Sequence, residues 1–461
     1  MPLRVAIIGA GVGGLALAVA LQANPNLDIQ VYERATELKE IGALVGVGPN
    51  ALRTLEKLGV SDVLTDEVGW RSPSGSTPLR DPSIAKRIPT CHAGIPMIFK
   101  HWKTGELLST DQYHNVPDHR HHYARMHRAK LQQALLKRIS RDIIHLGRKA
   151  ESVKAIRVEG VTVNFTNGTS IKADVVIGAD GIKSKIRHAF VPGHELTWLG
   201  DVVLRSTFDY SLVENIKEIP QDSSHFSGPN GFFFGTRIGS GGFGVTASFP
   251  VDPRNDGRYK EPVWNAPASV DTLRERFKDW APVVPKIIGR VPWVRQYANV
   301  AGAELEHWTF KDRVTLPGDA AHTHGGAFAA GVGLAIDDAY ALGLAFDHVF
   351  PSSVAIEAVS PTRIREVFDL SEATRRPHTG KVLAVVHENR ARTADRLQKL
   401  FAGEPETDED FRYRLTHRGD PAWVNEHDVE AAFVKVLEER ALGQAAPNTQ
   451  VEDQVQEQSR L

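Results

Sequence analysis

The chain contains 461 residues, of which 41% are hydrophobic and 24% are charged, and its formal net charge is −1 at pH 7. This length exceeds what one hydrophobic core supports and predicts about two or three domains, or one large domain with a subdomain. The charge balance gives no electrostatic reason to expect nucleic acid or an anionic membrane as a partner. The single cysteine, Cys91, excludes an intrachain disulfide and a cysteine-based metal site, and it fits a reducing, cytoplasmic location.

Residues 3–33 are predicted to form a strand, a helix and a second strand. The run LRVAIIGA is rich in β-branched residues, GGLALAVALQAN has helical composition, and DIQVYER forms the second strand. The apolar run at residues 5–21 contains four glycines and ends in a polar turn, so it does not predict a membrane anchor. No other stretch approaches the roughly 18–20 uninterrupted apolar residues that cross a bilayer.

The glycines of GAGVGG have the spacing of a dinucleotide-binding loop. Gly9 permits a tight turn, Gly11 lets the backbone approach a pyrophosphate, and Gly14 lets the helix pack closely on the strand. The phosphates would lie at the positive end of the helix, and Glu33 would accept hydrogen bonds from a ribose diol. A helix-packing pattern of glycines would look similar, but the flanking strands and the acid favour the dinucleotide. This loop alone does not distinguish FAD from NAD.

The next part of the chain predicts less regular structure. Residues 34–60 continue as loop and helix, and residues 62–122 are predicted to be irregular. Residues 123–139 have the apolar spacing of an amphipathic helix, and short alternating strands follow it. The histidine-rich run HRHHYARMH at residues 119–127 lacks acids or cysteines at ligand spacing, so it predicts a surface loop rather than a metal site.

Residues 195–305 change character, because strands separated by Gly, Ser, Pro and Asp predict a largely antiparallel sheet inserted into the nucleotide-binding fold. Helices are expected from residue 336 to about residue 400, and the polar end of the chain is predicted to be disordered. The predicted boundaries are 1–194 for the first part of the nucleotide-binding domain, with an irregular, substrate-contributing segment at about 62–122, then 195–305 for the sheet, 306–345 for the second part, 346–440 for helices and 441–461 for the tail.

A second glycine-rich stretch, PGDAAHTHGGAFAAGVGLAIDDAYAL, occupies residues 317–342. FAD is long enough to need a second close approach of backbone at its flavin end. Asp319 would accept a hydrogen bond from a ribityl hydroxyl, and the helix N-terminus near Gly331 and Val332 would face the flavin edge that becomes anionic on reduction. A ligand-free strand–loop–helix is the alternative, which the pairing with the first loop disfavours.

Three motifs together resemble those of a known family. They are GAGVGG with YER, DVVIGADGIKSKIR at residues 174–187, and PGDAAHTHGG…GVGLAIDDA. The sequence resembles the FAD-dependent aromatic-ring hydroxylases, the class A flavoprotein monooxygenases, and within them the salicylate hydroxylase-like branch. The resemblance implies an α/β fold with a Rossmann-type, glutathione-reductase-like FAD-binding domain, an inserted and mostly antiparallel substrate sheet, and C-terminal helices.

The resemblance adds FAD contacts at Gly46 and Arg128. It assigns DVVIGADGIKSKIR, which matches the family's Asp-Gly motif, to FAD and NAD(P)H binding, with the Asp180 carboxylate expected to hold the backbone of its own loop. The implied reaction is reduction of FAD by NADPH or NADH, capture of O2 as a C4a-hydroperoxide, and hydroxylation of a phenol or another electron-rich aromatic.

Two alternatives stay open at this point. One is the same flavin chemistry on an indole or alkaloid, by hydroxylation or epoxidation, and the other is a non-catalytic FAD-binding redox module. The sequence also leaves open the ring substrate, the regiochemistry, the loss of CO2, the choice of nicotinamide and the catalytic base. Either a monomer or a homodimer is compatible with it.

Three side chains are candidates for catalysis. Arg205, in DVVLRSTF, matches an arginine with which certain fungal phenol-dearomatising members position a phenolate; an exposed arginine paired with Asp209 is the alternative. Thr236 stands where those members carry a tyrosine. His324 is the candidate base towards a substrate hydroxyl, whereas His322 matches a position that the family commonly fills with histidine and is interpreted as structural.

Overall fold

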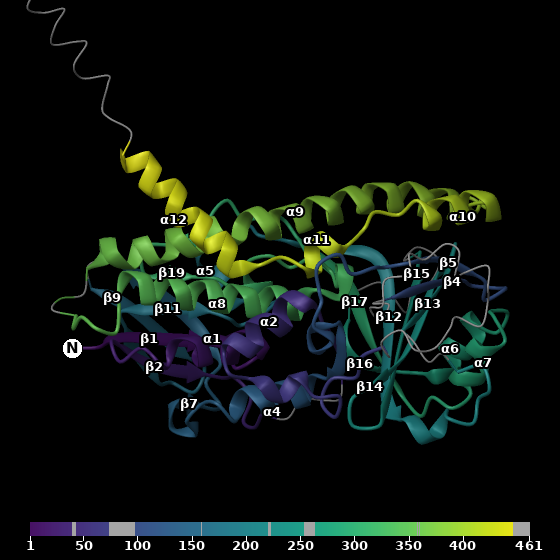
Figure 1. Ribbon diagram of the computed structural model, residues 1–461, viewed down its shortest axis with the longest axis horizontal. Helices are drawn as coiled ribbons and strands as arrows, with labels where there is room; N and C mark the ends of the chain where they lie inside the picture. The colour runs from purple at the N-terminus through teal and green to yellow at the C-terminus, as the bar shows by residue number, and fades with distance from the viewer. Residues whose placement is uncertain are drawn as a thin grey trace, which may run out of the picture.

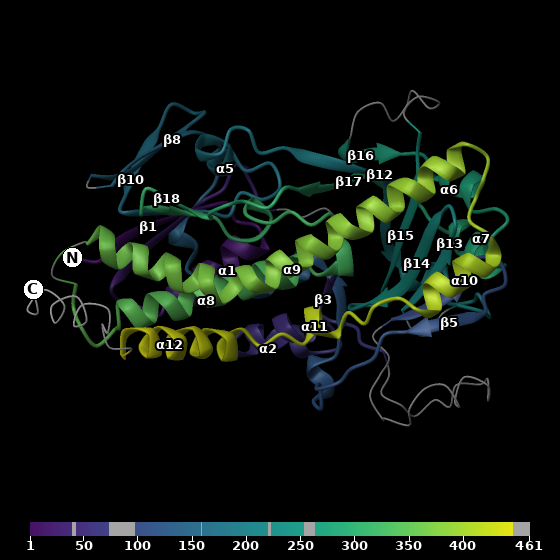
Figure 2. The same ribbon diagram turned by 90° about the horizontal axis from the view of Figure 1, so that it is seen from above.

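The computed structural model describes residues 1–38, 43–72, 97–157, 159–219, 223–252, 263–356, 358 and 360–445. Two large sheets lie side by side along the length of the molecule, and one long helix, α9 (Pro361–Phe401), runs across both of them (Figure 1, Figure 2). Cys91 and most of the tail that was expected to be disordered lie outside the described residues.

The first sheet is built around the N-terminal strand β1 (Leu3–Ile8) and has the order β18-β19-β11-β1-β2-β7. Its pairs are parallel except for the hairpin of β18 with β19. The other strands are β2 (Leu27–Tyr32), β7 (Ile144–His145), β11 (Val175–Gly178), β18 (Thr309–Phe310) and β19 (Val314–Thr315). This is the Rossmann-type arrangement that the sequence predicted, and the fold class is confirmed.

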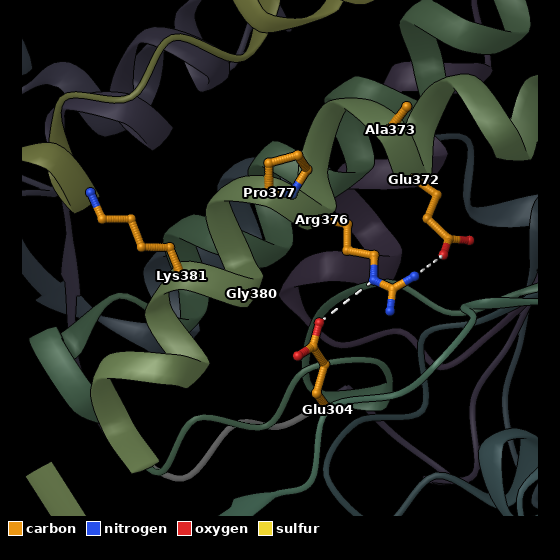
Figure 3. A pocket seen from close by; sticks show the side chains of 7 residues that line it. All are labelled: Glu304, Glu372, Ala373, Arg376, Pro377, Gly380 and Lys381. Carbon is orange, nitrogen blue, oxygen red and sulfur yellow. Dashed lines mark hydrogen bonds and ion pairs between the residues drawn. The ribbon is translucent and has the colours of Figure 1, made fainter. Parts of the chain in front are cut away.

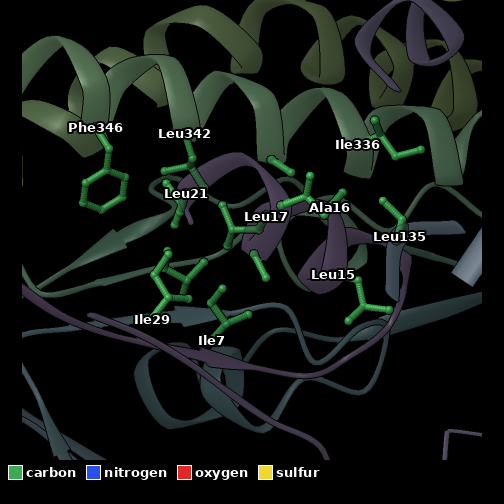
Figure 4. Packing of buried hydrophobic residues seen from close by; sticks show 14 of the residues in the cluster. Ile7, Leu15, Ala16, Leu17, Leu21, Ile29, Leu135, Ile336, Leu342 and Phe346 are labelled. Atoms are coloured by element: carbon green, nitrogen blue, oxygen red, sulfur yellow. The ribbon is translucent and has the colours of Figure 1, made fainter. Parts of the chain in front are cut away.

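Both faces of β1 are covered, which explains its nearly continuous apolar sequence. Val5 and Ile7 pack towards α1 (Val12–Leu21) and α8 (Gly331–Val349), and Figure 4 shows α1 between the sheet and α8. Ala6 and Ile8 pack on the opposite face towards a three-stranded sheet. Its strands are β8 (Ala150–Ile156), β9 (Gly160–Phe165) and β10 (Ser170–Ala173).

The second sheet has eight strands in the order β16-β17-β12-β15-β14-β13-β4-β5, antiparallel except where β13 meets β4. One face carries an aromatic-rich core beneath α6 (Val270–Arg276) and α7 (Val283–Ile288). The strands are β4 (Ile98–His101), β5 (Leu107–Thr110), β12 (Leu196–Asp209), β13 (Ser224–Gly228), β14 (Gly231–Ile238), β15 (Gly242–Pro250), β16 (Trp264–Ala268) and β17 (Val294–Gly302).

The helix predicted over residues 123–139 is wrong in its first part. Residues 124–127 form a strand, β6 (Ala124–His127), paired antiparallel with β3 (Leu44–Val47), and the helix α4 covers only Arg128–Leu136. Ala124 and Met126 are fully buried in the core next to that pairing. Tertiary strand pairing therefore overrides the helical spacing of the sequence.

Two other local predictions need correction. The segment predicted to be irregular supplies β4 and β5 to the second sheet, and its residues 73–96 lie outside the described residues. The histidine-rich run is not all surface loop, because its last residues form β6 and His122 is buried. The His122 ring stacks on Tyr113 at a centroid distance of 4.4 Å, and its Nε2 lies 3.1 Å from the Val116 carbonyl oxygen.

The C-terminal part is helical and returns along the molecule. After α9 the chain forms α10 (Asp408–Thr416) beside β5, then the short α11 (Ala422–Asn425), and finally α12 (Val429–Ala445) against α8 and α9 (Figure 2). The helix α2 (Pro49–Lys57) also packs in the first sheet's core. Across the described ranges, no helix has both the length and the apolar character that a bilayer crossing needs.

Candidate functional site

The first glycine-rich loop joins β1 to α1 in a tight turn that only glycine permits at two positions. Gly9 has a φ of 111°, and a Cβ atom on it would lie 2.4 Å from the Ala179 carbonyl oxygen. A Cβ atom on Gly14 would lie 2.0 Å from the Gly9 oxygen, so the close packing of helix on strand depends on glycine. Gly11 is the N-cap of α1, whose first backbone N–H groups lack helical partners.

Glu33 stands at the end of β2 beside this loop. One carboxylate oxygen accepts a hydrogen bond from the Ala10 backbone N–H at 2.8 Å, and the other accepts from Ala35 N–H at 2.9 Å. The carboxylate therefore holds the loop in place while remaining half-buried at its rim. This position is compatible with the predicted ribose contact.

Arg128 is the first residue of α4, because β6 ends one residue earlier. Its guanidinium reaches the first loop, where a Cβ atom on Gly11 would lie 3.7 Å from Nη2. Gly46, the other contact implied by the resemblance, lies in β3, where a Cβ atom would lie 2.4 Å from the Tyr123 hydroxyl oxygen. Glycine at residue 46 is therefore needed for packing against Tyr123, whatever it contacts in the site.

Asp180 follows β11 and lies against the first loop, with its Cα 3.1 Å from a Cβ placed on Gly9. Its carboxylate accepts hydrogen bonds from the backbone N–H of Lys185 at 2.6 Å and of Ile186 at 3.3 Å, at the start of α5 (Lys185–Phe190). Burial raises the pKa of Asp180, and these hydrogen bonds oppose that rise. The carboxylate holds the backbone of its own loop, as the sequence analysis expected.

The second glycine-rich stretch brings Asp319 to the same region. Its backbone carbonyl oxygen accepts hydrogen bonds from Arg187 Nη1 at 3.2 Å and from the Thr323 hydroxyl at 2.7 Å. Its side chain is exposed, and within the described ranges its carboxylate has no hydrogen bond or ion pair. Arg187 links Asp319 to the Asp180 loop, because its Nη2 donates to the Ile182 carbonyl oxygen at 2.6 Å.

The helix N-terminus at Gly331 and Val332 begins α8 as predicted, and His324 lies against it. A Cβ atom on Gly331 would lie 3.3 Å from Cε1 and 3.5 Å from Nε2 of His324. The imidazole is buried, and neither ring nitrogen has a hydrogen-bond partner among the described residues. Burial is the main cause that lowers the pKa of His324, so the ring is neutral at pH 7.

His322 has a different environment. Its Nε2 lies 2.6 Å from an Asp338 carboxylate oxygen, which also accepts the Gly318 backbone N–H at 2.8 Å, and Arg375 Nε donates to the other oxygen at 2.9 Å. Burial alone would raise the pKa of Asp338, but the charges and hydrogen bonds of His322 and Arg375 outweigh it and lower the pKa. These buried groups join α8, α9 and the Asp319 turn, in agreement with the structural role expected for His322.

Arg205 lies on the face of the second sheet opposite its aromatic core. Strand pairing places it in one row with Arg295, Thr246, Phe234, His225 and Phe99, on successive strands. A Cβ atom on Gly326 would lie 3.9 Å from Arg205 Nη2, so the guanidinium borders the second glycine-rich stretch. Its Nε is buried without a hydrogen-bond partner among the described residues.

The surroundings of Arg205 lower the pKa of its guanidinium. Burial lowers the pKa of Arg205 most, the nearby positive charge of Arg128 lowers it further, and Tyr297 acts in the opposite direction. The Tyr297 ring lies 5.4 Å from the guanidinium carbon. The alternative partner Asp209 is not used in the described structure, since its carboxylate instead accepts the Ser211 backbone N–H at 2.8 Å.

Thr236 fits its predicted catalytic role poorly. It is on the same face of the sheet as Arg205 but is fully buried. Its hydroxyl oxygen lies 2.9 Å from the Ser223 hydroxyl and 3.0 Å from the Arg237 carbonyl oxygen. These bonds are made within the sheet, which favours a structural role for Thr236.

Two residues on this face were not predicted from the sequence. Tyr297 contacts Arg205 from the neighbouring strand, and His225 stacks on Phe232 at 4.4 Å and approaches Phe99 at 5.1 Å. Burial lowers the pKa of His225 to about 4, so its ring is a neutral member of an aromatic surface. Only the strand register reveals them, because they are far from Arg205 in sequence.

An open groove of about 490 Å³ lies elsewhere, along α9. Figure 3 shows Arg376 between Glu304 and Glu372, with N–O distances of 3.6 Å and 3.2 Å, while Lys381 points away from this group. In this groove Arg376 is already paired with two acids, and Lys381 Nζ lies over the Trp423 ring at 4.1 Å from its centre. This groove is not the candidate site.

The two loops together fit an extended dinucleotide. The first offers helix N–H groups, Arg128 and a surface at Gly11 without a side chain. The second offers the helix N-terminus at Gly331 together with the Asp319 carboxylate and the His324 nitrogens, which have no partner among the described residues. Donors for phosphate, an acceptor for a hydroxyl and N–H groups for an anionic ring edge are the groups that FAD requires.

Comparisons with known proteins agree with this geometry. The sequence model of a family described as FAD binding domain matches residues 2–353. The chain is 31% identical to 6-methylsalicylate 1-monooxygenase of Aspergillus terreus over 358 residues, 73% of each chain. It is 28% identical to a salicylate hydroxylase of Pseudomonas putida, covering 74% of this chain and 76% of that protein.

Solved structures show the same fold. A salicylate hydroxylase in complex with its substrate superposes with a TM-score of 0.72 at 22% identity, covering 94% of this chain and 98% of that chain. HpxO of Klebsiella pneumoniae, in complex with FAD and uric acid, superposes with a TM-score of 0.66 at 22% identity, covering 94% and 97%.

The chain belongs to the FAD-binding-domain family and, within it, to the salicylate hydroxylase-like aromatic hydroxylases. It is a flavin-dependent monooxygenase that binds FAD and uses NAD(P)H, the co-substrate typical of the family. The cofactor and the enzyme class predicted from the sequence are therefore confirmed.

Proposed function

We propose that this monooxygenase hydroxylates a phenolic aromatic ring whose oxygen is held beside Arg205. The observation that carries this proposal is the half-buried guanidinium of Arg205, whose Nε is buried without a partner among the described residues and whose Nη2 borders Gly326. A fixed cation favours the phenolate form of a bound phenol, and a phenolate ring is richer in electrons than the neutral phenol.

Relatives support the same substrate class. The named activities include 6-methylsalicylate 1-monooxygenase, salicylate hydroxylase and, at 29% identity, the hispidin-3-hydroxylase of Neonothopanus nambi. Each name describes oxidation of a small ring compound. We extend only the class, an electron-rich ring bearing a hydroxyl, to this chain.

Bound FAD supplies the redox chemistry, taking a hydride from NAD(P)H and activating O2 for transfer of one oxygen atom. We infer that the glycine-rich loop at residues 9–14, Arg128 and Glu33 hold its adenosine diphosphate end. Asp319 would accept from a ribityl hydroxyl, and the α8 N-terminus at Gly331 and Val332 would stabilise negative charge on the flavin. The Asp180 loop would contact both nucleotides.

We assign to His324 the role of accepting the phenol proton. Its buried imidazole is neutral at pH 7, its nitrogens have no partner among the described residues, and it adjoins the α8 N-terminus. A neutral imidazole nitrogen accepts a proton from a hydroxyl and carries it as imidazolium. Phe234 and His225, in the row of Arg205, would form an apolar wall that excludes water from the ring.

The test is anaerobic reduction of the bound flavin by NADPH and by NADH, with a matched panel of hydroxylated benzoates, simple phenols and indoles. We expect one phenol class to accelerate flavin bleaching at least tenfold and to gain one oxygen atom in air. Acceleration by indoles alone would contradict the phenolate proposal and favour the indole or alkaloid alternative.

We also infer a cytoplasmic location and a monomer or homodimer. The single cysteine supports the first of these inferences. Fractionation of the source cells and light scattering of the purified enzyme would test them.

A further inference from the structure

The second glycine-rich stretch contains a strained segment directly before α8. We call residues 324–330 the distal loop. Gly325 and Gly326 have φ values of 66° and 71°, and the two non-glycine residues Phe328 and Ala329 have 55° and 51°. Side-chain-bearing residues rarely adopt this left-handed conformation, and it persists only where surrounding contacts enforce it.

One contact comes from Tyr123, the residue directly before β6. The Tyr123 hydroxyl donates to the Ala329 carbonyl oxygen at 3.2 Å, and the same ring packs on Gly46. This contact fixes one side of the distal loop. It does not reach Phe328, whose strained backbone needs a support of its own.

That support comes from the C-terminal part of the chain. We call residues 420–427, which include α11, the C-terminal strap. The Trp423 ring meets the Phe328 ring edge-on at a centroid distance of 6.0 Å and an angle of 72°. Around them is a separate hydrophobic cluster, made of distal-loop, α8, α9 and strap residues: Phe328, Ala330, Leu334, Val382, Trp423 and Val424.

The strap is anchored on both sides of Trp423. Before it, Asp420 lies against the His114 ring; after it, the Glu426 carboxylate accepts the backbone N–H of His114 at 2.8 Å and of Asn115 at 2.7 Å. The strap ends at His427, whose ring stacks on His378 of α9 at 4.0 Å and 9°. A segment pinned at both ends holds its central side chain in a defined place.

Trp423 is also fixed from the side of α9. Lys381 Nζ lies 4.1 Å from the centre of its ring, and the His378 ring meets it at 86° and 6.0 Å. The indole is thus held by a cation and an edge-on ring while it contacts Phe328. The strap lies outside residues 2–353, the part that the family model matches.

We propose that Trp423 is a positioning residue for the cofactor, acting through Phe328 to hold the distal loop and the α8 N-terminus in the geometry that binds FAD. The proposal rests on the flavin end of FAD lying at this loop. Removal of the indole would let the strained loop relax, which weakens FAD binding and admits water to the reacting ring.

The test uses the full-length enzyme carrying Trp423→Ala, Trp423→Phe or the control Tyr413→Ala, an exposed aromatic of α10 stacked only on His417 among the described residues. FAD dissociation constants come from flavin fluorescence on titrating the apoprotein, and coupling comes from H2O2 formed per NAD(P)H consumed. For Trp423→Ala we expect a Kd about tenfold higher and more H2O2. Trp423→Phe should recover most of the affinity, and Tyr413→Ala should match the wild type.

A double-mutant cycle separates this role from general destabilisation. Phe328→Leu is combined with Trp423→Ala, and the FAD Kd of all four proteins is measured after circular dichroism confirms folding. We expect the FAD Kd of the double variant to be no higher than that of the weaker-binding single variant, because both changes remove the same contact. Additive losses, or an unchanged Kd in Trp423→Ala, would overturn the proposal. FAD affinity is measured without a substrate, so this result is independent of whether the enzyme accepts phenols.

Discussion

The cofactor side of the site presents mainly backbone, whereas the substrate side presents mainly side chains. At residues 9–14 and 331–333 the groups proposed to contact FAD are N–H groups at helix N-termini, and a Cβ on Gly14 would collide with the Gly9 oxygen at 2.0 Å. On the second sheet, one row of side chains from separate strands forms the surface around Arg205. Backbone groups suit a cofactor that a whole family shares, whereas a surface made of side chains can vary with the substrate.

Substitutions on the two sides should therefore have different effects. Damage to the cofactor side should reduce folding or FAD binding, because its geometry depends on buried contacts that hold the backbone. Damage to the substrate side should leave yellow, folded protein with altered turnover. The following substitutions test that division, from the largest expected effect to the smallest.

Asp338→Ala should have the largest effect. It leaves His322 and Arg375 buried without their shared partner, and breaking such a buried pair costs about 3–5 kcal/mol of unfolding free energy. Urea denaturation of the apoprotein and holoprotein measures this loss. The control is Asp395→Ala, whose exposed pair with Lys399 should contribute about 0.5 kcal/mol or less. A loss below 1 kcal/mol for Asp338→Ala would show that this network does not hold the cofactor side together.

Arg205→Ala should lower kcat/KM for the phenolic substrate about 100-fold while FAD stays bound, because the phenolate loses its charged partner. Stopped-flow reduction and oxygen consumption measure the change, and more H2O2 per NAD(P)H is expected. Arg237→Ala is a matched control, since its guanidinium lies 4.5 Å from the Tyr210 ring, which packs against the sheet's aromatic core. Wild-type turnover by Arg205→Ala would contradict the assignment of Arg205 to the substrate site.

Asp319→Ala should raise the FAD Kd about tenfold, the equivalent of about 1.4 kcal/mol and of one hydrogen bond to a charged acceptor. The fold should be unaffected, because the carboxylate is exposed and its described contacts are made by its backbone oxygen. Apoprotein titration with FAD measures the effect. Asp209→Ala, at the exposed end of β12, is the control. Full flavin retention with unchanged affinity would contradict the assignment of Asp319 to the ribityl chain.

The smallest effect is a pH dependence in the C-terminal strap. Burial, with a smaller effect of Arg375, lowers the pKa of His427 to about 4, below its unfolded value of about 6.5. The unfolded chain therefore binds the proton more readily, so the stability contributed by neutral His427 is present above pH 6.5 and is lost as the pH falls towards 4.

Thermal unfolding at pH 7 and pH 5 checks this expectation. His427→Gln should lose less stability than the wild type over that range, by about 1–2 kcal/mol. His417→Gln, which alters an exposed histidine of the same region, should behave as the wild type does. An equal loss of stability in His427→Gln and in the wild type would mean that protonation of His427 does not affect the stability of the protein.

The sequence by itself determined the features whose residues are contiguous. The glycine loop with its helix, Glu33 at the end of the next strand and the start of α8 near Gly331 follow from local steric and hydrogen-bonding rules. The family resemblance of the three motifs then indicated the enzyme class. A single sequence also indicated that residues 195–305 form strands, because alternating composition is local.

Only the tertiary structure decided which side chains meet. The pairing of β6 with β3 turned the predicted start of a helix into a strand and set Arg128 at a helix N-terminus. The register of the second sheet put Tyr297 and His225 on Arg205's face and left Thr236 with its hydroxyl bonded inside the sheet. The chain's return through α11 brought Trp423 to Phe328. Such contacts join residues far apart in sequence, and they depend on the summed packing of many elements rather than on any local pattern.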